Sequence, residues 1–320
     1  MRVALLSEGS DQVGAGHVMR TLVLGEALED RGCEVSFAGE CTLPWLSNIL
    51  ARWASVSLED RIARANIDAV VIDSYTITQA RVDSLKSEGI SVVLIADDAT
   101  PSLNVDICIL PCVDSSWAPP LGASESFTVR GVDYLLIRAD IRESKLGNAS
   151  GRSAGGRLLV TLGGAASASG ILRVVDAAVQ AGWRGGIDAI TTARDLVEEL
   201  PIRRNLELYE PGPALLPLAE AASFVVSAAG VTSWEMLALG KPLCIFKTAA
   251  NQVQNYEYQT THGLSWGLGD VRDPISVESF AAVMTDRSLR DSMALRAATA
   301  VDGLGGQRGA DIIMARLARR

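Results

Sequence analysis

The chain is poor in cysteine, aromatic residues and long apolar runs, and each shortage excludes a class of protein. Its five cysteines are an odd number and include no CxxC pair, which argues against a disulfide framework and against a zinc site. The apolar runs are all short and interrupted, so we expect no membrane span. Aromatic residues make up only 5% of the 320 residues, whereas glycine and alanine are abundant. This profile is typical of an α/β protein with short buried strands.

Positive charge is also in short supply, because 29 Lys and Arg stand against 38 Asp and Glu, for a formal net charge of −9. A broad nucleic-acid-binding surface needs concentrated Lys and Arg, so we expect no nucleic-acid partner. Residues 1–7 are too short for a secretory signal and fit a first strand better, so we expect a cytoplasmic protein. The oligomeric state stays open, with a monomer favoured.

What the chain does contain is a repeated alternation of short Val- and Ile-rich runs with helix-periodic segments, which predicts buried parallel strands. The alternation pauses at residues 143–156, where Gly, Ser and Asn dominate, and we interpret this stretch as a linker. We therefore predict an α/β fold of two Rossmann-like domains facing a cleft, at residues 1–142 and 157–320, with the last helix a candidate for packing back on the first domain.

One of only two histidines lies in the stretch DQVGAGHVMR, residues 11–20. A GxGxxG fingerprint would need glycine in place of Met19, and Gly14 lies seven residues after Ser7, so we expect no nicotinamide or flavin cofactor. His17 falls in the first turn of a predicted helix, where the dipole disfavours the protonated imidazole. A neutral imidazole suits general-base chemistry. The alternative is that His17 is only a polar cap.

The stretch SAAGVTSWEMLALGKP, residues 227–242, predicts a strand that ends at a glycine-containing turn and then a helix. Hydroxyls at Thr232 and Ser233 suit the helix start, and unpaired backbone amides there would suit a diphosphate. Glu235 could accept hydrogen bonds from a ribose diol. The alternative is a capping box formed by Thr232 and Glu235.

Three further strand ends carry polar or glycine residues. Gly163 and Gly164 allow close backbone approach to a ligand in the turn LGGAASAS. The amides of AANQVQN, residues 249–255, could bind sugar hydroxyls or merely cap a helix. Asp73, Ser74 and Tyr75 follow one strand, and Asp97 with Asp98 follow another. Adjacent aspartates at a strand end point apart, so we expect no metal site.

Taken in order, these motifs together with YLLIRADI, residues 134–141, and VDGLGGQR, residues 301–308, resemble one family over nearly the whole chain. It comprises the UDP-sugar hydrolases of pseudaminic acid biosynthesis and the related spore-coat polysaccharide proteins. The resemblance implies the glycosyltransferase-B fold and a metal-independent reaction. In that reaction water attacks the anomeric carbon of UDP-2,4-diacetamido-2,4,6-trideoxy-β-L-altrose, inverts it and releases UDP.

The resemblance also implies roles for individual residues, with UDP-sugar as the substrate. His17 would activate water, and we expect Asn255 to take part in turnover. The expected nucleotide-binding residues are Gly163, Gly164, Ser227, Gly230, Thr232, Ser233 and Glu235. The expected sugar-binding residues are Gly16, Arg20, Asp73, Tyr75, Asn251 and Gln252.

Two departures from the family lie in loops expected to face the ligand. Ser7, Glu8 and Gly9 replace an Arg-x-Asp pattern, and Ala166, Ser167 and Ala168 replace an Asp-Pro pair and its following Asn. They favour a different sugar or a different acceptor. Three hypotheses follow: an inverting UDP-sugar hydrolase as the main one, a glycosyltransferase that uses the same donor site, and a catalytically silent nucleotide-sugar-binding protein.

Overall fold

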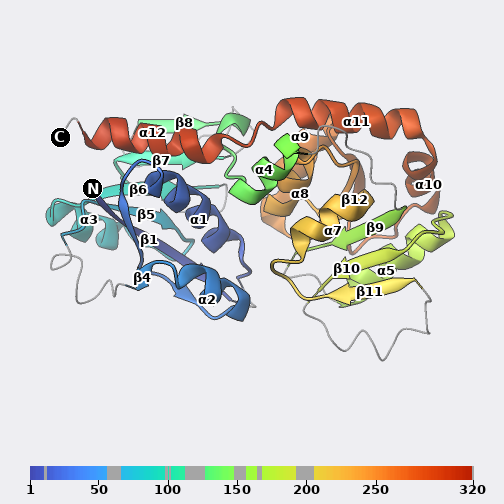
Figure 1. Cartoon of the computed structure of the whole chain (residues 1–320), viewed down its shortest axis with the longest axis horizontal. Helices are drawn as coiled ribbons and strands as arrows, with labels where there is room; N and C mark the ends of the chain where they lie inside the picture. Colours follow the sequence, from blue (N-terminus) through green and yellow to red (C-terminus); the bar gives the residue numbers. More distant parts are fainter. Residues whose placement is uncertain are drawn as a thin grey trace. The chain divides into compact units, whose positions relative to one another are not determined.

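The computed structural model describes residues 1–10, 13–55, 66–97, 100, 102–111, 127–147, 156–163, 168–191 and 205–318. These residues divide into two compact units, one built from residues 1–138 with 303–320 and the other from residues 139–302. Figure 1 labels many of their helices and strands.

The first unit is a parallel sheet with helices on both faces. Its strands are β1 (Arg2–Gly9), β2 (Glu34–Phe37), β3 (Glu40–Cys41), β4 (Ala54–Ser55), β5 (Ala69–Asp73), β6 (Ser91–Ile95), β7 (Ile107–Leu110) and β8 (Phe127–Arg130). Its helices are α1 (Gly16–Glu29), α2 (Pro44–Leu50), α3 (Gln79–Ser87), the 3-10 turn η1 (Val132–Tyr134) and α12 (Gly305–Leu317). The strand order is β4-β2-β1-β5-β6-β7-β8, and β3 pairs with the end of β1.

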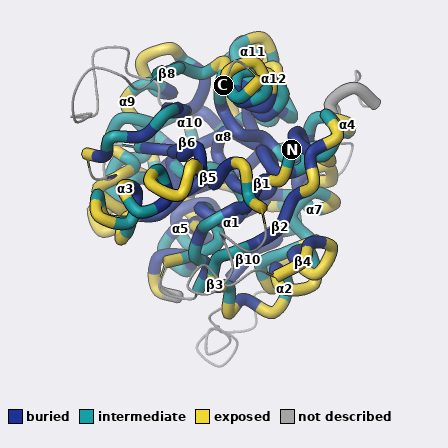
Figure 2. The backbone as a smooth tube through the Cα atoms, turned by 90° about the vertical axis from the view of Figure 1, so that its left-hand side faces the viewer, coloured by how far each residue is buried: buried dark blue, intermediate teal, exposed yellow. Residues whose placement is uncertain are grey.

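The central strands of this sheet are apolar on both faces because helices cover both. Val3, Leu5 and Val71 belong to the core beneath α1 and α12, whereas Ala4 and Val70 belong to the core beneath α3. Successive side chains of a strand point to opposite faces, so a continuous Val- and Ile-rich run fills both cores. Figure 2 shows β5 in the colour of buried residues.

The second unit repeats this plan. Its strands are β9 (Arg157–Thr161), β10 (Ile187–Ile190), β11 (Leu206–Tyr209), β12 (Ala222–Ala228), β13 (Leu243–Lys247) and β14 (Trp266–Asp270). Its helices are α4 (Ala139–Gly147), α5 (Ala168–Gln180), α7 (Leu215–Ala221), α8 (Val231–Ala238), η2 (Ala250–Gln252), α9 (Val253–Thr261), α10 (Val277–Thr285) and α11 (Arg287–Ala300). The parallel sheet has the order β11-β10-β9-β12-β13-β14.

In both sheets the strand order reverses at one place. The chain runs outward from β1 through β2 to β4 and then returns to place β5 on the other side of β1. It does the same in the second unit, where β12 returns to the free side of β9. Open parallel sheets bind ligands beyond the carboxyl ends of the two strands where the order reverses. The topology therefore marks one candidate ligand site in each unit.

The predicted α/β fold with two Rossmann-like domains is confirmed by these two parallel sheets. The first helix ends as its sequence indicates, because Gly32 adopts a φ of +79° and the Cys33 amide bonds back to the Leu28 carbonyl, closing a Schellman turn. The helix expected near residues 193–200 lies outside the described residues.

The boundaries between the units differ from the expected ones. Residues 143–147, expected in a linker, complete helix α4, which packs against α8 through a stretch that contains the fully buried Ile141. The rest of the expected linker, residues 148–155, lies outside the described part. At the other end, residues 303–320 belong to the first unit, the domain on which the last helix was a candidate to pack.

Helix α12 joins the first unit because its glycines allow it to approach α1 closely. A Cβ added to Gly306 would lie 2.8 Å from Val23 Cγ1, and one added to Gly309 would lie 3.1 Å from Leu24 Cδ1. A Cβ on Gly305 would overlap the backbone carbonyl oxygen of Leu135. Hence Gly305 and Gly306 of VDGLGGQR, residues 301–308, serve packing within the first unit.

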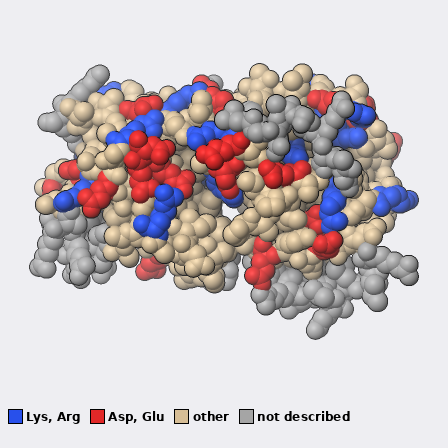
Figure 3. Space-filling view, viewed as in Figure 1, with Lys and Arg blue, Asp and Glu red and all other residues tan. Residues whose placement is uncertain are grey.

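In the part of the chain that the structure describes, no helix has both the length and the apolar character that crossing a membrane requires. On the face drawn in Figure 3, the described acidic and basic side chains are interspersed. Charge of one sign therefore does not dominate that face.

We expect Gly305→Ala to lower the free energy of unfolding by about 1–3 kcal/mol, because the new methyl group must displace the backbone at Leu135. Gly16→Ala is the matched control, since an added Cβ there meets nothing within 4 Å. Chemical denaturation of both variants measures the difference. Equal stability of the two would show that α12 does not depend on this close approach.

Candidate functional site

The carboxyl ends of β1, β5 and β6 bring five polar residues together at the reversal point of the first sheet. Residue Ser7 of β1 is in register with Asp73 of β5, and α1 begins shortly after β1. The group, called the His17 cluster below, consists of His17, Arg20, Asp73, Tyr75 and Asp97. Two come from the first turns of α1, two from the end of β5 and one from the end of β6.

The centre of the His17 cluster is a hydrogen bond between a buried imidazole and a buried carboxylate. His17 Nδ1 lies 2.6 Å from Asp73 Oδ1, and the Asp73 side chain is only 2% exposed. A carboxylate can only accept here, so Nδ1 carries the hydrogen, and in the neutral imidazole with this tautomer Nε2 keeps a lone pair. Within the described part of the chain, Nε2 makes no hydrogen bond. The polar-cap alternative is wrong, because the N-cap of α1 is Ala15 and the His17 ring binds Asp73.

Arg20 grips the same carboxylate from the next turn of α1. Its Nε lies 2.7 Å from Asp73 Oδ2, and a terminal nitrogen lies 2.7 Å from Oδ1. The other terminal nitrogen lies 3.1 Å from Asp97 Oδ2. Burial lowers the pKa of Arg20, but attraction by Asp73 and Asp97 and the hydrogen bonds to Asp73 outweigh it, so the pKa lies above its ordinary value. Arg20 is therefore charged, and its guanidinium is bound to Asp73 and Asp97.

Tyr75 connects the cluster to the surface. Its hydroxyl donates to Asp97 Oδ2 at 2.7 Å, and its ring lies edge-on to the His17 ring at 4.5 Å between centroids. The residue is 36% exposed. Of the five residues, Tyr75 has the largest surface left for a ligand.

These contacts correct part of the expected sugar site. Arg20 and Asp73 were expected to bind sugar, but their side chains are 12% and 2% exposed and bind each other. Their charges are already paired, so they hold the site rather than contact a sugar. Tyr75 remains available. Gly16 is the first residue of α1, and the space around it is open.

The structure adds Asp97, which the sequence analysis had weighed only as half of a paired-aspartate metal motif. Its Oδ1 accepts from Thr100 Oγ1 at 3.3 Å, and its backbone amide donates to the same hydroxyl at 2.9 Å. The available signal was the polar ending IADDA, because β6 lies directly beside β5. Among the described residues, no group of three or more His, Cys, Asp or Glu is arranged to hold a metal ion.

The second candidate site lies at the reversal point of the second sheet, where β9 and β12 end side by side. Gly163 follows β9 with a φ of +81°, a left-handed conformation that glycine adopts at little cost. Gly230 follows β12 and precedes helix α8. Gly164, the other half of the predicted double-glycine turn, lies outside the described residues, as do Ala166 and Ser167.

Helix α8 begins without a side-chain cap. Its N-cap is Gly230, in an extended conformation, and Thr232 is the second residue of the helix. The capping-box alternative is therefore wrong, because Thr232 does not occupy the capping position. Uncapped amides and the positive end of the helix dipole favour an anion here. Glu235 lies one turn further on and is 3% exposed.

Two serines expected to bind nucleotide are instead parts of the interior. Ser227 is fully buried and donates to the Ala228 carbonyl at 3.1 Å. Ser233 is fully buried, donates to the Gly230 carbonyl at 2.7 Å and accepts from Gln259 Nε2 at 2.9 Å. These bonds anchor the turn from behind, so we withdraw both side chains as ligand contacts.

The amide residues after β13 divide into two groups. Gln252 Oε1 accepts from the Thr248 amide at 2.9 Å, and Gln252 Nε2 lies 3.6 Å from where a Gly230 Cβ would be. Gln252 is thus held beside the start of α8. Asn255 Oδ1 accepts from the indole of Trp234 at 3.3 Å, which fixes α9 against α8. Asn251 is exposed.

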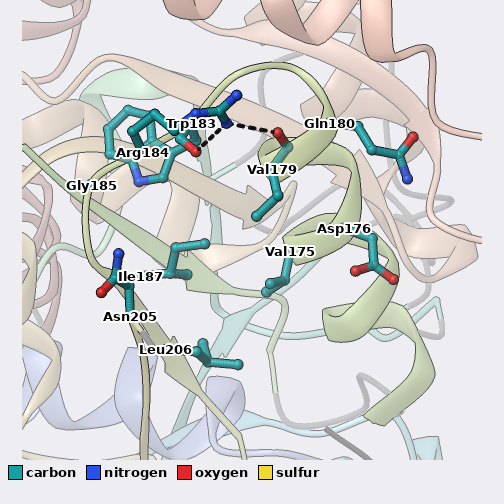
Figure 4. A pocket seen from close by; sticks show the side chains of 10 residues that line it. All are labelled: Val175, Asp176, Val179, Gln180, Trp183, Arg184, Gly185, Ile187, Asn205 and Leu206. Atoms are coloured by element: carbon teal, nitrogen blue, oxygen red, sulfur yellow. Dashed lines mark hydrogen bonds between the residues drawn. The ribbon is translucent and has the colours of Figure 1, made fainter. Parts of the chain in front are cut away.

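The second unit also has a pocket of about 450 Å³ between α5 and the start of β10 and β11 (Figure 4). Apolar side chains line it, among them Val175, Trp183 and Leu206, and the Arg184 guanidinium donates to the Trp183 and Val179 carbonyls. The pocket lies at the amino ends of the strands, whereas Gly163 and Gly230 follow the carboxyl ends. It is therefore not the site that the topology marks.

No protein-family model matches the chain, and no curated protein matches its sequence. Solved structures do match it over almost their whole length. The spinosyn rhamnosyltransferase SpnG is 15% identical, with a TM-score of 0.69 and 100% of both chains covered. The glycosyltransferase VinC in complex with dTDP is 13% identical, with a TM-score of 0.66 and 100% of both chains covered.

A third match is named for a different activity. The putative UDP-N-acetylglucosamine 2-epimerase from Listeria monocytogenes is 13% identical, with a TM-score of 0.65, and covers 100% of this chain and 97% of that one. At such identities the likeness concerns the fold. The chain has the glycosyltransferase-B fold, with two parallel-sheet α/β domains.

We predict that Glu235→Gln weakens binding of UDP or dTDP by about 1–3 kcal/mol if the carboxylate accepts hydrogen bonds from the ribose. Titration calorimetry measures the affinity, and thermal unfolding measures the stability of the same variant. A loss of stability with unchanged affinity would instead assign Glu235 to the interior of the second unit. Gln254→Ala is the matched control for a nearby partly exposed residue.

Proposed function

We propose that the protein is an inverting glycosyltransferase that moves a sugar from a nucleoside-diphosphate donor to a hydroxyl of a small-molecule acceptor. The observation that carries the proposal is the bond between His17 Nδ1 and Asp73, which leaves Nε2 as a base at the reversal point of the first sheet. The fold is shared with proteins named as glycosyltransferases, which supports this reaction class.

In this proposal the first unit supplies the base. Nε2 of His17 takes the proton from the acceptor hydroxyl as its oxygen bonds to the anomeric carbon. The bond from that carbon to the diphosphate breaks, and its electron pair leaves with the nucleotide. Asp73 keeps the hydrogen of the imidazole on Nδ1 throughout. Tyr75, which is exposed and lies against the His17 ring, is the proposed contact for the sugar or the acceptor.

The second unit supplies the nucleotide site. The uncapped start of α8 stabilises the diphosphate as its charge grows, because backbone donors there are already oriented. Gly163 and Gly230 let the backbone come close to the phosphates. Gln252, held beside Gly230 through Thr248, donates its free amide hydrogens to the phosphate or the sugar. The proposed donor-binding residues also include Thr232, Glu235, Asn251 and Asn255.

The second candidate is the hydrolase reaction, in which water replaces the acceptor hydroxyl. The motif GAGHVMR, residues 14–20, supports it through the resemblance to UDP-sugar hydrolases of pseudaminic acid biosynthesis. The end of β1, which the sequence suggested was a loop, carries Ser7, Glu8 and Gly9 where the family has Arg-x-Asp. Glu8 instead accepts a hydrogen bond from Thr76 at 3.1 Å. This difference favours an acceptor other than water.

An assay of nucleotide release decides between the two candidates. Purified protein is incubated with UDP- and dTDP-sugars, first alone and then with a panel of hydroxyl-bearing small molecules. For a transferase we expect release of the nucleotide to depend on the acceptor and to be accompanied by a glycosylated product. Release of free sugar at the same rate without acceptor would establish the hydrolase instead.

We expect His17→Ala to lower kcat by about 10²–10⁴-fold, the usual contribution of general-base catalysis. The Kd for the nucleotide should not change, because the proposed nucleotide site belongs to the other unit. His262→Ala is the control, since the only other histidine is exposed and stacks on Tyr258. Unchanged turnover in His17→Ala would refute the role of His17.

A further inference from the structure

Asp73 is shared between two partners, and this sharing has a consequence for His17. Asp73 Oδ1 accepts from both His17 Nδ1 and the Arg20 guanidinium, at 2.6 and 2.7 Å, while Oδ2 accepts from Arg20 Nε. The guanidinium nitrogen lies 3.0 Å from His17 Nδ1. Since Nδ1 carries a hydrogen, this short distance is not a bond, because both groups converge as donors on one oxygen.

If an imidazole were the only partner of a buried carboxylate, the carboxylate would favour the imidazolium. The protonated ring would then be the only positive charge that could neutralise it. An imidazolium has no lone pair on Nε2 and cannot act as a base. Arg20 supplies the opposite charge from a group that stays protonated. Its positive charge also repels a second positive charge 3.0 Å away.

Arg20 is itself held in place from the other side. Asp97 Oδ2 accepts from Arg20 at 3.1 Å and from the Tyr75 hydroxyl at 2.7 Å. Thr100 fixes Asp97 through two hydrogen bonds. The contacts therefore run in series from Thr100 through Asp97 and Arg20 to Asp73 and His17.

We propose that Arg20, held by Asp97, is a positioning residue that neutralises Asp73 and so keeps His17 as a neutral imidazole with its hydrogen on Nδ1. The catalytic role of the neutral imidazole rests on the proposed function. The protonation state and tautomer of His17 are properties of the free protein. Among the described residues, the charged or titratable groups around His17 are Arg20 on α1, Asp73 and Tyr75 at the end of β5, and Asp97 after β6. Glu8, at the end of β1, is bound to Thr76.

The test is nitrogen NMR of the protein grown with isotope-labelled histidine, because the two ring nitrogens report protonation and tautomer directly. The chain has two histidines, and His262→Gln assigns the signals. In the otherwise unchanged protein we expect His17 to be neutral, with its hydrogen on Nδ1. An imidazolium in this protein at neutral pH would overturn the proposal.

In Arg20→Met we expect the His17 signals to change to those of the imidazolium at the same pH, with a drop in kcat of about tenfold or more. Unchanged His17 signals would overturn the proposal. Arg20→Met leaves a buried charge unpaired and can fail to fold. Arg20→Met with Asp73→Asn removes both charges, and there we expect a neutral ring that has lost its single tautomer. A retained Nδ1 tautomer would contradict the role of Asp73.

Asp97→Asn tests the outer part of the series in a partly exposed side chain. We expect a smaller imidazolium fraction than in Arg20→Met and an unchanged Kd for UDP or dTDP. A spectrum identical to that of the unsubstituted protein would remove Asp97 from the proposal. The spectra need no substrate, so the positioning role can be tested even if the protein turns over no nucleotide sugar.

Discussion

Parallel strands all end at the same edge of their sheet, and this constraint determines where the polar residues of the chain can meet. Because β5 returns to the free side of β1, the last residue of β5 and the first turn of α1 come together in a small space. That space is buried, so the Asp73 carboxylate must be paired within it. His17 and Arg20 satisfy the carboxylate from a single helix, three residues apart on one face. The topology thus creates the site and also buries a carboxylate there that must be neutralised.

Most of the fold can be predicted from the sequence because it depends on local patterns. Val- and Ile-rich runs specify buried strands, and Gly32 specifies where the first helix ends. The boundaries of the two units depend instead on contacts between distant residues. Residues 143–147 have the composition of a linker, but Ile141 at the preceding turn is buried and α4 packs on α8. Likewise, the association of α12 with α1 depends on glycines whose partners are far away in the chain.

The position of the candidate site could be predicted from the sequence. Which of its side chains face a ligand and which bind each other could not. The sequence places His17 near a strand end and Asp73 at another, yet it does not give the register that makes them partners. Arg20 and Asp73 carry charges that suit a ligand, and only the structure shows that they bind each other. Ser227 and Ser233 carry hydroxyls typical of a phosphate turn, but both are turned inward. Side-chain direction depends on tertiary packing, which residue type alone does not specify.

The packing of α12 on α1 also affects how the protein can be made. The first unit is interrupted in the sequence by the whole of the second, since residues 139–302 lie between its two parts. The second unit is continuous and can fold as soon as it has left the ribosome. The first unit must wait for residues 305–317, which cover the helix that carries His17. During synthesis, the surface of α1 that α12 covers stays uncovered until residues 305–317 have been added, and exposed apolar surface of this kind favours aggregation.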